Sequence, residues 1–227
     1  MSRERFSCVL FDLDGTITDS APGITATLAY TLERLGRPVP TPAELVAFVG
    51  PPILDGFATL GLDRQDARTA LGIYRERYAA TGAFDSALYP GVAELLRRLH
   101  DAGIPLGLAT SKPESQALRI LEHFGLLQLF AFAGGASEDE VRSAKADVVA
   151  HSLQNLAARG VPVDRPVLVG DREHDVRGAE ANGVPTIFVT WGYGSVAERV
   201  GAADIVSSAA ELERRLLPED KEMEPPS

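Results

Sequence analysis

The sequence contains very little cysteine and no block of basic residues. Cys8 is the single cysteine among 227 residues, which excludes a disulfide framework and a thiolate metal cage. The formal net charge is −10, and the sequence contains no run of lysine or arginine. The balance argues against nucleic acid or an anionic membrane as a partner. A small anionic substrate stays compatible with it, because a bound divalent cation reverses the local field.

Long hydrophobic runs are also missing. No apolar stretch approaches the length of a membrane span, and the one before Asp12 is too short for the apolar core of a signal peptide. We therefore expect a cytoplasmic protein in which Cys8 is a small buried hydrophobic residue. Apolar residues make up 45% of the chain and charged residues 24%, as in a globular protein with one substantial core and a smaller appended unit.

Short apolar segments alternate with helical patterns in the second half of the chain. Strands are expected at 9–11, 104–109, 130–133, 167–169, 186–189 and near 205, and helices at 92–103, 114–123, 145–158 and 175–182. Such alternation is typical of a parallel sheet covered by helices on both faces. The sequence therefore predicts an α/β fold with a Rossmann-like parallel core.

The region between the first strand and this alternating part predicts helices alone, with no strand. Apolar residues recur at helical spacing in four stretches, 20–36, from 44, 52–60 and 63–80. We predict an all-helical domain at 17–86 inserted into a core domain made of 1–16 and 87–217. The charged, proline-containing segment 218–227 is expected to be a disordered tail.

Three of the expected strands end in acidic or hydroxyl-bearing residues. The first ends in Asp12, followed by Asp14, the second in Thr110 and Ser111, and the fourth in Asp171. The carboxyl ends of parallel strands meet at one edge of a sheet, so these side chains are expected in one crevice. Taken alone, Asp12 and Asp14 are also compatible with ordinary turn residues.

Asp171 and Asp175 are spaced i, i+4 at a strand-to-helix junction, which lets both face that crevice. Four neighbouring carboxylates raise one another's pKa unless a cation lies among them. A divalent ion with oxygen ligands resolves the repulsion, and Mg²⁺ suits such a set. Asp175 also fits a helix N-cap. Lys145, just before a helix, is either a solvated surface lysine or the ammonium that balances the acids and grips a phosphate oxygen.

In their order and spacing, Asp12-Leu13-Asp14-Gly15-Thr16, Thr110, Lys145 and Gly170-Asp171 with Asp175 resemble the haloacid dehalogenase superfamily. The resemblance spans nearly the whole chain. Asp19-Ser20, the helical insertion, Gly50-Pro51-Pro52 and Thr110-Ser111-Lys112-Pro113 are similar to its phosphoglycolate-phosphatase-like branch, which also holds 5′-nucleotidases and sugar-phosphate phosphatases.

The resemblance implies a Mg²⁺-dependent phosphomonoesterase that acts on a small phosphorylated metabolite through an aspartyl phosphate. It implies Asp12 as the nucleophile, Asp14 as the acid and base, and Asp12, Asp14 (through its carbonyl) and Asp171 as metal ligands. It further implies Thr110, Ser111 and Lys145 as phosphate-binding groups, with Asp175 in support. The helical domain would be a cap, and Phe48, Gly50 and Pro51 are our candidates for contact with the leaving group, although a rigid connector between helices explains them equally well.

Other functions stay open at this point. A phosphomutase would share the whole phosphoryl-transfer site, a dehalogenase would need neither Asp14 nor Asp171, and a binding protein on this fold would need none of the acids. The segment 192–197 matches G-x-G-x-x-A, but too little chain follows for a dinucleotide site, so we expect a turn near the crevice. Either a monomer or a homodimer is compatible with the sequence.

Overall fold

The computed structural model describes residues 6–217 and contains one six-stranded sheet with the order β5-β4-β1-β6-β7-β8. All neighbouring strands of this sheet run parallel. The strands are β1 (Cys8–Phe11), β4 (Leu106–Pro113), β5 (Phe132–Ala136), β6 (Pro166–Gly170), β7 (Thr186–Val189) and β8 (Asp204–Val206). The predicted α/β fold with a parallel core is confirmed.

The strand order reverses once, between β1 and β6. The chain runs outward from β1 through β4 to β5, then crosses to β6 and runs the other way to β8. This is the order of a doubly wound Rossmann-type sheet, in which ligands bind outside the carboxyl ends of the strands at the reversal point. The crevice is therefore expected beside Asp12, which follows β1, and Asp171, which follows β6.

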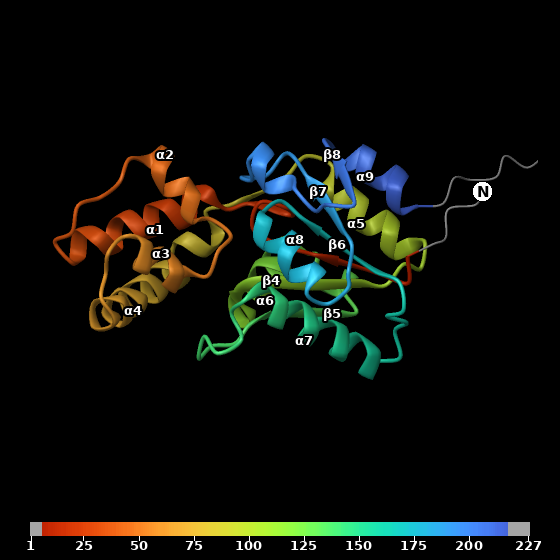
Figure 1. Ribbon diagram of the computed structural model, residues 1–227, viewed down its shortest axis with the longest axis horizontal. Helices are drawn as coiled ribbons and strands as arrows, with labels where there is room; N and C mark the ends of the chain where they lie inside the picture. The colour runs from red at the N-terminus through yellow and green to blue at the C-terminus, as the bar shows by residue number, and fades with distance from the viewer. Residues whose placement is uncertain (1–5, 218–227) are drawn as a thin grey trace, which may run out of the picture.

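Helices cover both faces of the sheet (Figure 1). They are α5 (Val92–Asp101), α6 (Glu114–His123), α7 (Lys145–Ala158), α8 (Glu173–Glu180) and α9 (Ala209–Leu216). Because successive strand residues point to opposite faces, Val9 and Phe11 pack with α5, α6 and α9, whereas Cys8 and Leu10 pack with α7 and α8. Cys8 is fully buried, as predicted, and burial raises the pKa of its thiol to about 11.

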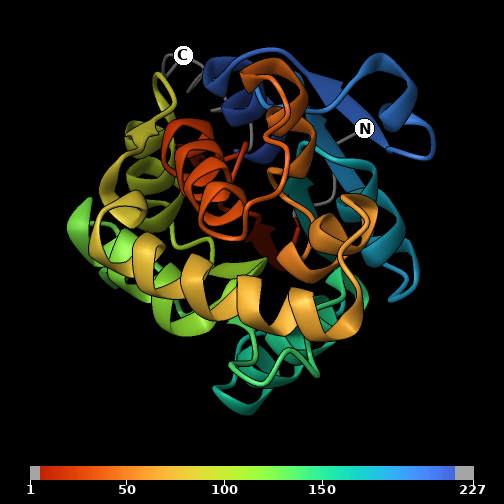
Figure 2. The ribbon, with the colours of Figure 1, turned by 90° about the vertical axis from the view of Figure 1, so that its left-hand side faces the viewer.

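The helices α1 (Ala21–Arg34), α2 (Pro42–Leu45), α3 (Ile53–Thr59) and α4 (Arg64–Ala80) form a separate group, here called the helical insert. It lies beside the carboxyl edge of the sheet, at the left of Figure 1, and faces the viewer in Figure 2. It has its own apolar core, which includes Leu28, Phe57 and Tyr74. The division of the chain at 16/17 and 86/87 stays a prediction.

The prediction that 17–86 lacks strands is wrong. Thr18 and Asp19 form strand β2, which pairs antiparallel with β3 (Ala87–Leu88). The two chain segments that join the insert to the core run side by side, so their backbone groups satisfy one another. Neither segment has the apolar alternation of a longer strand, so no local pattern predicts a strand there.

Several predicted boundaries also shift. The strand expected to end at Ala109 continues as β4 to Pro113, with an irregular register after Ala109. β5 lies two residues later than predicted, α8 begins at Glu173 instead of 175, and α9 follows the last strand without having been expected. Within the described part of the chain, no helix has the length and apolar character needed to cross a membrane. The predicted tail at 218–227 lies outside the described residues.

Candidate active site

Asp12 follows β1 at the point where the strand order reverses. Its backbone N–H continues the sheet ladder by donating to the Val169 carbonyl at 2.9 Å, and only 2% of the residue is exposed. Its Oδ1 lies 2.8 Å from Lys145 Nζ. Burial raises the pKa of Asp12 to about 6, although the Lys145 ammonium acts in the opposite direction. Asp12 is thus a buried carboxyl whose ionised form depends on neighbouring cations.

Lys145 is the first residue of α7, and it is buried instead of solvated. Its ammonium lies 2.8 Å from Asp175 Oδ1 as well as from Asp12, and it donates to the Ala109 carbonyl at 3.0 Å. Burial by itself would lower the pKa of Lys145, but the two carboxylates raise it above its ordinary value. Lys145 therefore stays charged and holds the ends of three elements together.

Asp171 follows β6 and is fully buried. It accepts hydrogen bonds from the Thr16 hydroxyl at 3.2 Å and the Tyr193 backbone N–H at 2.7 Å. Burial, and then the charges of Asp175 and Asp12, raise its pKa well above the ordinary value. Among residues 6–217 no lysine or arginine forms an ion pair with it. A bound cation would therefore favour the ionised form of Asp171.

Asp175 lies in the first turn of α8 and binds the chain that leads into that helix. Its Oδ2 accepts from the backbone N–H groups of Asp171 and Arg172, at 3.0 and 2.9 Å. Its Oδ1 faces Lys145. Asp175 is thus compatible with both interpretations from the sequence, because Oδ2 binds backbone groups at the start of α8 and Oδ1 contacts Lys145.

The acids fit a divalent cation. Oxygen atoms of Asp12, Asp171 and Asp175 all lie within 4.8 Å of one another, and all three residues are buried. Carboxylate oxygens are the hard ligands that Mg²⁺ prefers. The carboxylate of Asp14 is not part of this group, because it is directed to Lys112 instead. Any contribution of Asp14 to the same ion would come from its backbone carbonyl.

Thr110 and Ser111 lie in the extension of β4 beyond the end of β1, next to the carbonyl that Lys145 binds. Both are buried, and the Thr110 hydroxyl accepts from the Lys112 N–H at 3.3 Å. Ser111 and Lys145 together line an open hollow of about 230 Å³. The predicted phosphate-binding residues are therefore gathered at one edge of the sheet.

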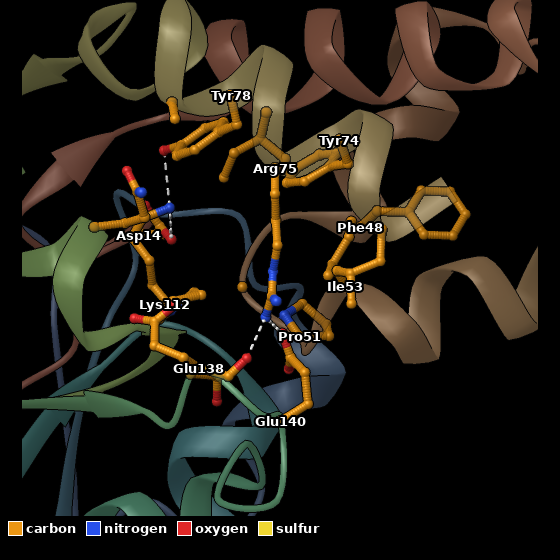
Figure 3. A pocket seen from close by; sticks show the side chains of 17 residues that line it. Asp14, Phe48, Pro51, Ile53, Tyr74, Arg75, Tyr78, Lys112, Glu138 and Glu140 are labelled. Carbon is orange, nitrogen blue, oxygen red and sulfur yellow. Dashed lines mark hydrogen bonds and ion pairs between the residues drawn. The ribbon is translucent and has the colours of Figure 1, made fainter. Parts of the chain in front are cut away.

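A second cavity of about 310 Å³ lies between the sheet edge and the helical insert. Figure 3 shows residues that line it, and Asp14 faces it from the core. Phe48, Gly50 and Pro51, the candidates from the sequence, all line this cavity. A further set was not predicted: Ile53, Tyr74, Arg75, Tyr78, Lys112, Gln116, Glu138 and Glu140.

Lys112 is the main residue that sequence reasoning passed over. Its ammonium lies 2.9 Å from Asp14 Oδ2 and donates to the Tyr78 hydroxyl at 2.9 Å (Figure 3). Burial alone would lower the pKa of Lys112, but Asp14 and the tyrosines raise it above its ordinary value. Its position directly after Thr110 and Ser111 was the signal available in the sequence.

The glycines of 192–197 form the expected turn beside the acids. A Cβ at Gly192 would lie 2.3 Å from the Gly15 carbonyl oxygen and 2.4 Å from Asp171 Oδ2. Tyr193, between the two glycines, donates its N–H to Asp171. The small residues thus let this loop approach the acidic centre closely.

Taken together, these features define an α/β protein with a buried carboxylate and lysine centre at the reversal point of its sheet. The model of the family described as haloacid dehalogenase-like hydrolase matches residues 9–189. The chain belongs to this haloacid dehalogenase-like hydrolase family, as the resemblance predicted.

Three relatives illustrate the range of the family. The tyrosine-protein kinase PtkA of Mycobacterium tuberculosis is 46% identical over 186 residues, which are 82% of this chain and 62% of PtkA. The chain thus spans less than two thirds of that relative's length. A 5′-nucleotidase of Pseudomonas aeruginosa is 40% identical over 84% of this chain and 86% of its own. The crystal structure of a "predicted phosphatase" from Clostridium acetobutylicum superposes with a TM-score of 0.88 at 39% identity, covering 94% of this chain and 99% of that one.

Proposed function

We propose that this protein is a Mg²⁺-dependent phosphomonoesterase that acts on a small phosphorylated metabolite through an aspartyl phosphate. The observation that carries the proposal is the buried ion pair of Asp12 and Lys145. Oxygens of Asp12, Asp171 and Asp175 lie within 4.8 Å of one another beside it. A carboxylate nucleophile, an ammonium and a cation-binding acid cluster in one crevice are the components that phosphoryl transfer requires.

In the first half-reaction, a carboxylate oxygen of Asp12 attacks phosphorus and the bond from phosphorus to the leaving oxygen breaks. Asp14 gives a proton to that oxygen, so that a neutral alcohol departs. In the second half-reaction, water attacks phosphorus, Asp14 takes its proton, and the bond to Asp12 breaks. Two observations support this role: Asp14 lines the cavity, and its Oδ1 has no hydrogen-bond partner among the described residues.

The remaining groups bind the phosphoryl oxygens and hold the nucleophile. Lys145, Thr110 and the backbone N–H of Ser111 would stabilise charge on the non-bridging oxygens. Asp12, Asp171 and the Asp14 carbonyl would hold Mg²⁺, which supplies positive charge to the phosphoryl group when bound. Asp175 would keep Lys145 oriented through their 2.8 Å contact.

The cavity favours a leaving group without a negative charge of its own. Its two cations are already paired, Lys112 with Asp14, and Arg75 with Glu140 and the Glu138 carbonyl. A second anionic group would meet no uncommitted cation there. The stacked rings of Tyr74 and Tyr78, with centroids 5.6 Å apart, give the cavity a flat apolar wall. We infer preference for a nucleoside or sugar monophosphate over phosphoglycolate.

A second candidate is phosphoryl transfer to a protein tyrosine, because the 46% identical relative is named a tyrosine kinase. A phosphomutase reaction also uses the same groups. For the intact protein we propose a monomer or homodimer in the cytoplasm that engages neither nucleic acid nor membrane. Incubation with ATP and a tyrosine peptide, and with a sugar phosphate primed by its bisphosphate, separates both alternatives from release of inorganic phosphate.

The deciding experiment measures phosphate release from p-nitrophenyl phosphate with Mg²⁺ and with chelator. We expect activity with Mg²⁺, loss with EDTA, and loss in Asp12→Asn with an unchanged circular dichroism spectrum. Asp101→Asn, an exposed acid at the end of α5, is the matched control. Substantial activity in Asp12→Asn would refute the nucleophile. A screen of nucleotides, sugar phosphates and phosphoglycolate then tests the inferred leaving group.

A further inference from the structure

A chain of contacts joins the helical insert to Asp14. Lys112 Nζ lies 2.9 Å from Asp14 Oδ2 and 2.9 Å from the hydroxyl of Tyr78, which belongs to α4. The side chains of Lys112 and Asp14 are 5% and 7% exposed. All three residues therefore interact away from bulk water, where such contacts are strong and directional.

Tyr78 is fixed in place from its other side. Its ring stacks on Tyr74 with an interplanar angle of 6°, and the Lys112 ammonium lies 4.6 Å from its centroid. Tyr74 in turn meets Phe57 edge-on inside the core of the insert. The position of the Tyr78 hydroxyl thus depends on the packing of the insert as well as on Lys112 of β4.

We propose that Tyr78 and Lys112 are positioning residues for Asp14, so that its carboxylate is oriented for proton transfer only when the helical insert lies over the sheet edge. The proposal rests on the proposed phosphatase function, in which Asp14 exchanges a proton with the leaving group. Lys112 binds Oδ2 of Asp14, whereas Oδ1 has no hydrogen-bond partner among the described residues, and Asp14 lines the cavity. The insert would then act on the chemistry as well as on substrate binding.

The leaving group decides how much the orientation of Asp14 matters. An alkoxide leaves poorly unless it is protonated, whereas p-nitrophenolate leaves well without a proton. Loss of the Tyr78 hydroxyl should therefore slow phosphoryl transfer to Asp12 from an alkyl monophosphate and spare that transfer from the aryl ester. A defect in folding, closure or phosphate binding would slow both substrates alike.

The test compares kcat/KM, which reports transfer to Asp12 and not the later hydrolysis, for an alkyl monophosphate and p-nitrophenyl phosphate in Tyr78→Phe, which keeps the ring. We expect about a five- to tenfold loss on the alkyl ester, the effect of one hydrogen bond. On the aryl ester we expect a change within about twofold. Lys112→Gln should show the same selectivity with a larger loss. Tyr30→Phe, which removes a hydroxyl from α1 outside the cavity, should behave as the native protein.

A double-mutant cycle sharpens the result. In an Asp14→Asn background, Tyr78→Phe should cause no further loss, because the group it positions is already disabled. Equal losses on both esters, or additive losses in the cycle, would overturn the assignment while leaving the phosphatase function in place. If the native protein hydrolyses neither ester, or if Asp12→Asn is active, the proposed function itself fails and the assignment fails with it.

Discussion

The phenol of Tyr193 donates a 2.8 Å hydrogen bond to Asp19 Oδ1, across the junction between the core and the helical insert. The hydroxyl oxygen of Tyr193 also accepts from the backbone N–H groups of Ser20 and Ala21, at 2.7 and 2.9 Å. The backbone N–H of Tyr193 meanwhile binds Asp171. One residue thus contacts both the acidic centre and the first segment that leads into the insert.

We expect Tyr193→Phe to loosen that segment. Two backbone N–H groups and a carboxylate lose their partner, so the free energy of unfolding should fall by about 1–3 kcal/mol. Limited proteolysis should cut sooner near 19–21, and urea denaturation gives the stability change. Tyr30→Phe is the control. A protein with native stability and native cleavage kinetics would show that the junction does not depend on this phenol.

A methyl group at Gly15 should disturb the acidic centre. Its φ is +86°, and a Cβ there would lie 2.3 Å from Asp171 Oδ2. Gly15→Ala should therefore displace Asp171 and weaken Mg²⁺ binding, measured by calorimetric titration. Gly36→Ala has a similar φ of +65° but no atom within 4 Å of the added methyl. It should cost only the backbone strain of about 1–2 kcal/mol, with metal affinity unchanged. Equal metal affinity in both variants would contradict this.

Lys145→Met should leave Asp12 and Asp175 without their shared ammonium. Breaking a buried ion pair from one side typically costs about 3–5 kcal/mol. We expect the free energy of unfolding to fall by that order when a chelator is present. Part of it should return with Mg²⁺, since a bound cation again neutralises the acids. Urea denaturation with and without Mg²⁺ measures both effects. A small loss that Mg²⁺ does not change would mean that the acids are not charged in the native protein.

The ion pair and hydrogen bonds of Glu198 should make the protein less stable at acid pH. Burial alone would raise its pKa, but Arg172, at 2.7 Å, and the N–H groups of Ser195 and Glu173 lower the pKa to about 2. A lowered native pKa stabilises the fold above the unfolded pKa, and that contribution disappears as pH falls toward the native value. Glu198→Gln should therefore be less stable than the native protein at neutral pH. The difference in the free energy of unfolding between the two proteins should decrease between about pH 4.5 and pH 2. Chemical denaturation at several pH values measures this difference. A constant difference would exclude this linkage.

Part of the site could be predicted from the order of the strands and the residue types at their ends. Asp12, Thr110 and Asp171 each follow or extend an apolar strand, and parallel strands bring such positions to one edge. Asp171 and Asp175 are spaced i, i+4, so a strand-to-helix junction at this point was enough to predict that both face the crevice. These inferences depend on local periodicity, which the side chains of a buried strand impose directly.

The sequence did not predict which residues pair across the interface between core and insert. Lys112 is paired with Asp14 and Tyr78, and Arg75 from α4 reaches Glu140 in a loop after β5. Seen in sequence, Lys112, Arg75 and Glu140 resemble ordinary surface residues. Only the docking of the insert onto the sheet edge selects their partners.

The sequence by itself determined the alternation of strands and helices, the helical character of the insert, and the acids that end the strands. Periodic burial fixes these features segment by segment. The tertiary structure alone decided that Lys145 is buried between two acids, that β2 and β3 pair at the junction, and that Asp14 faces an ammonium held from the insert. Those outcomes depend on contacts between distant segments, which no local pattern encodes.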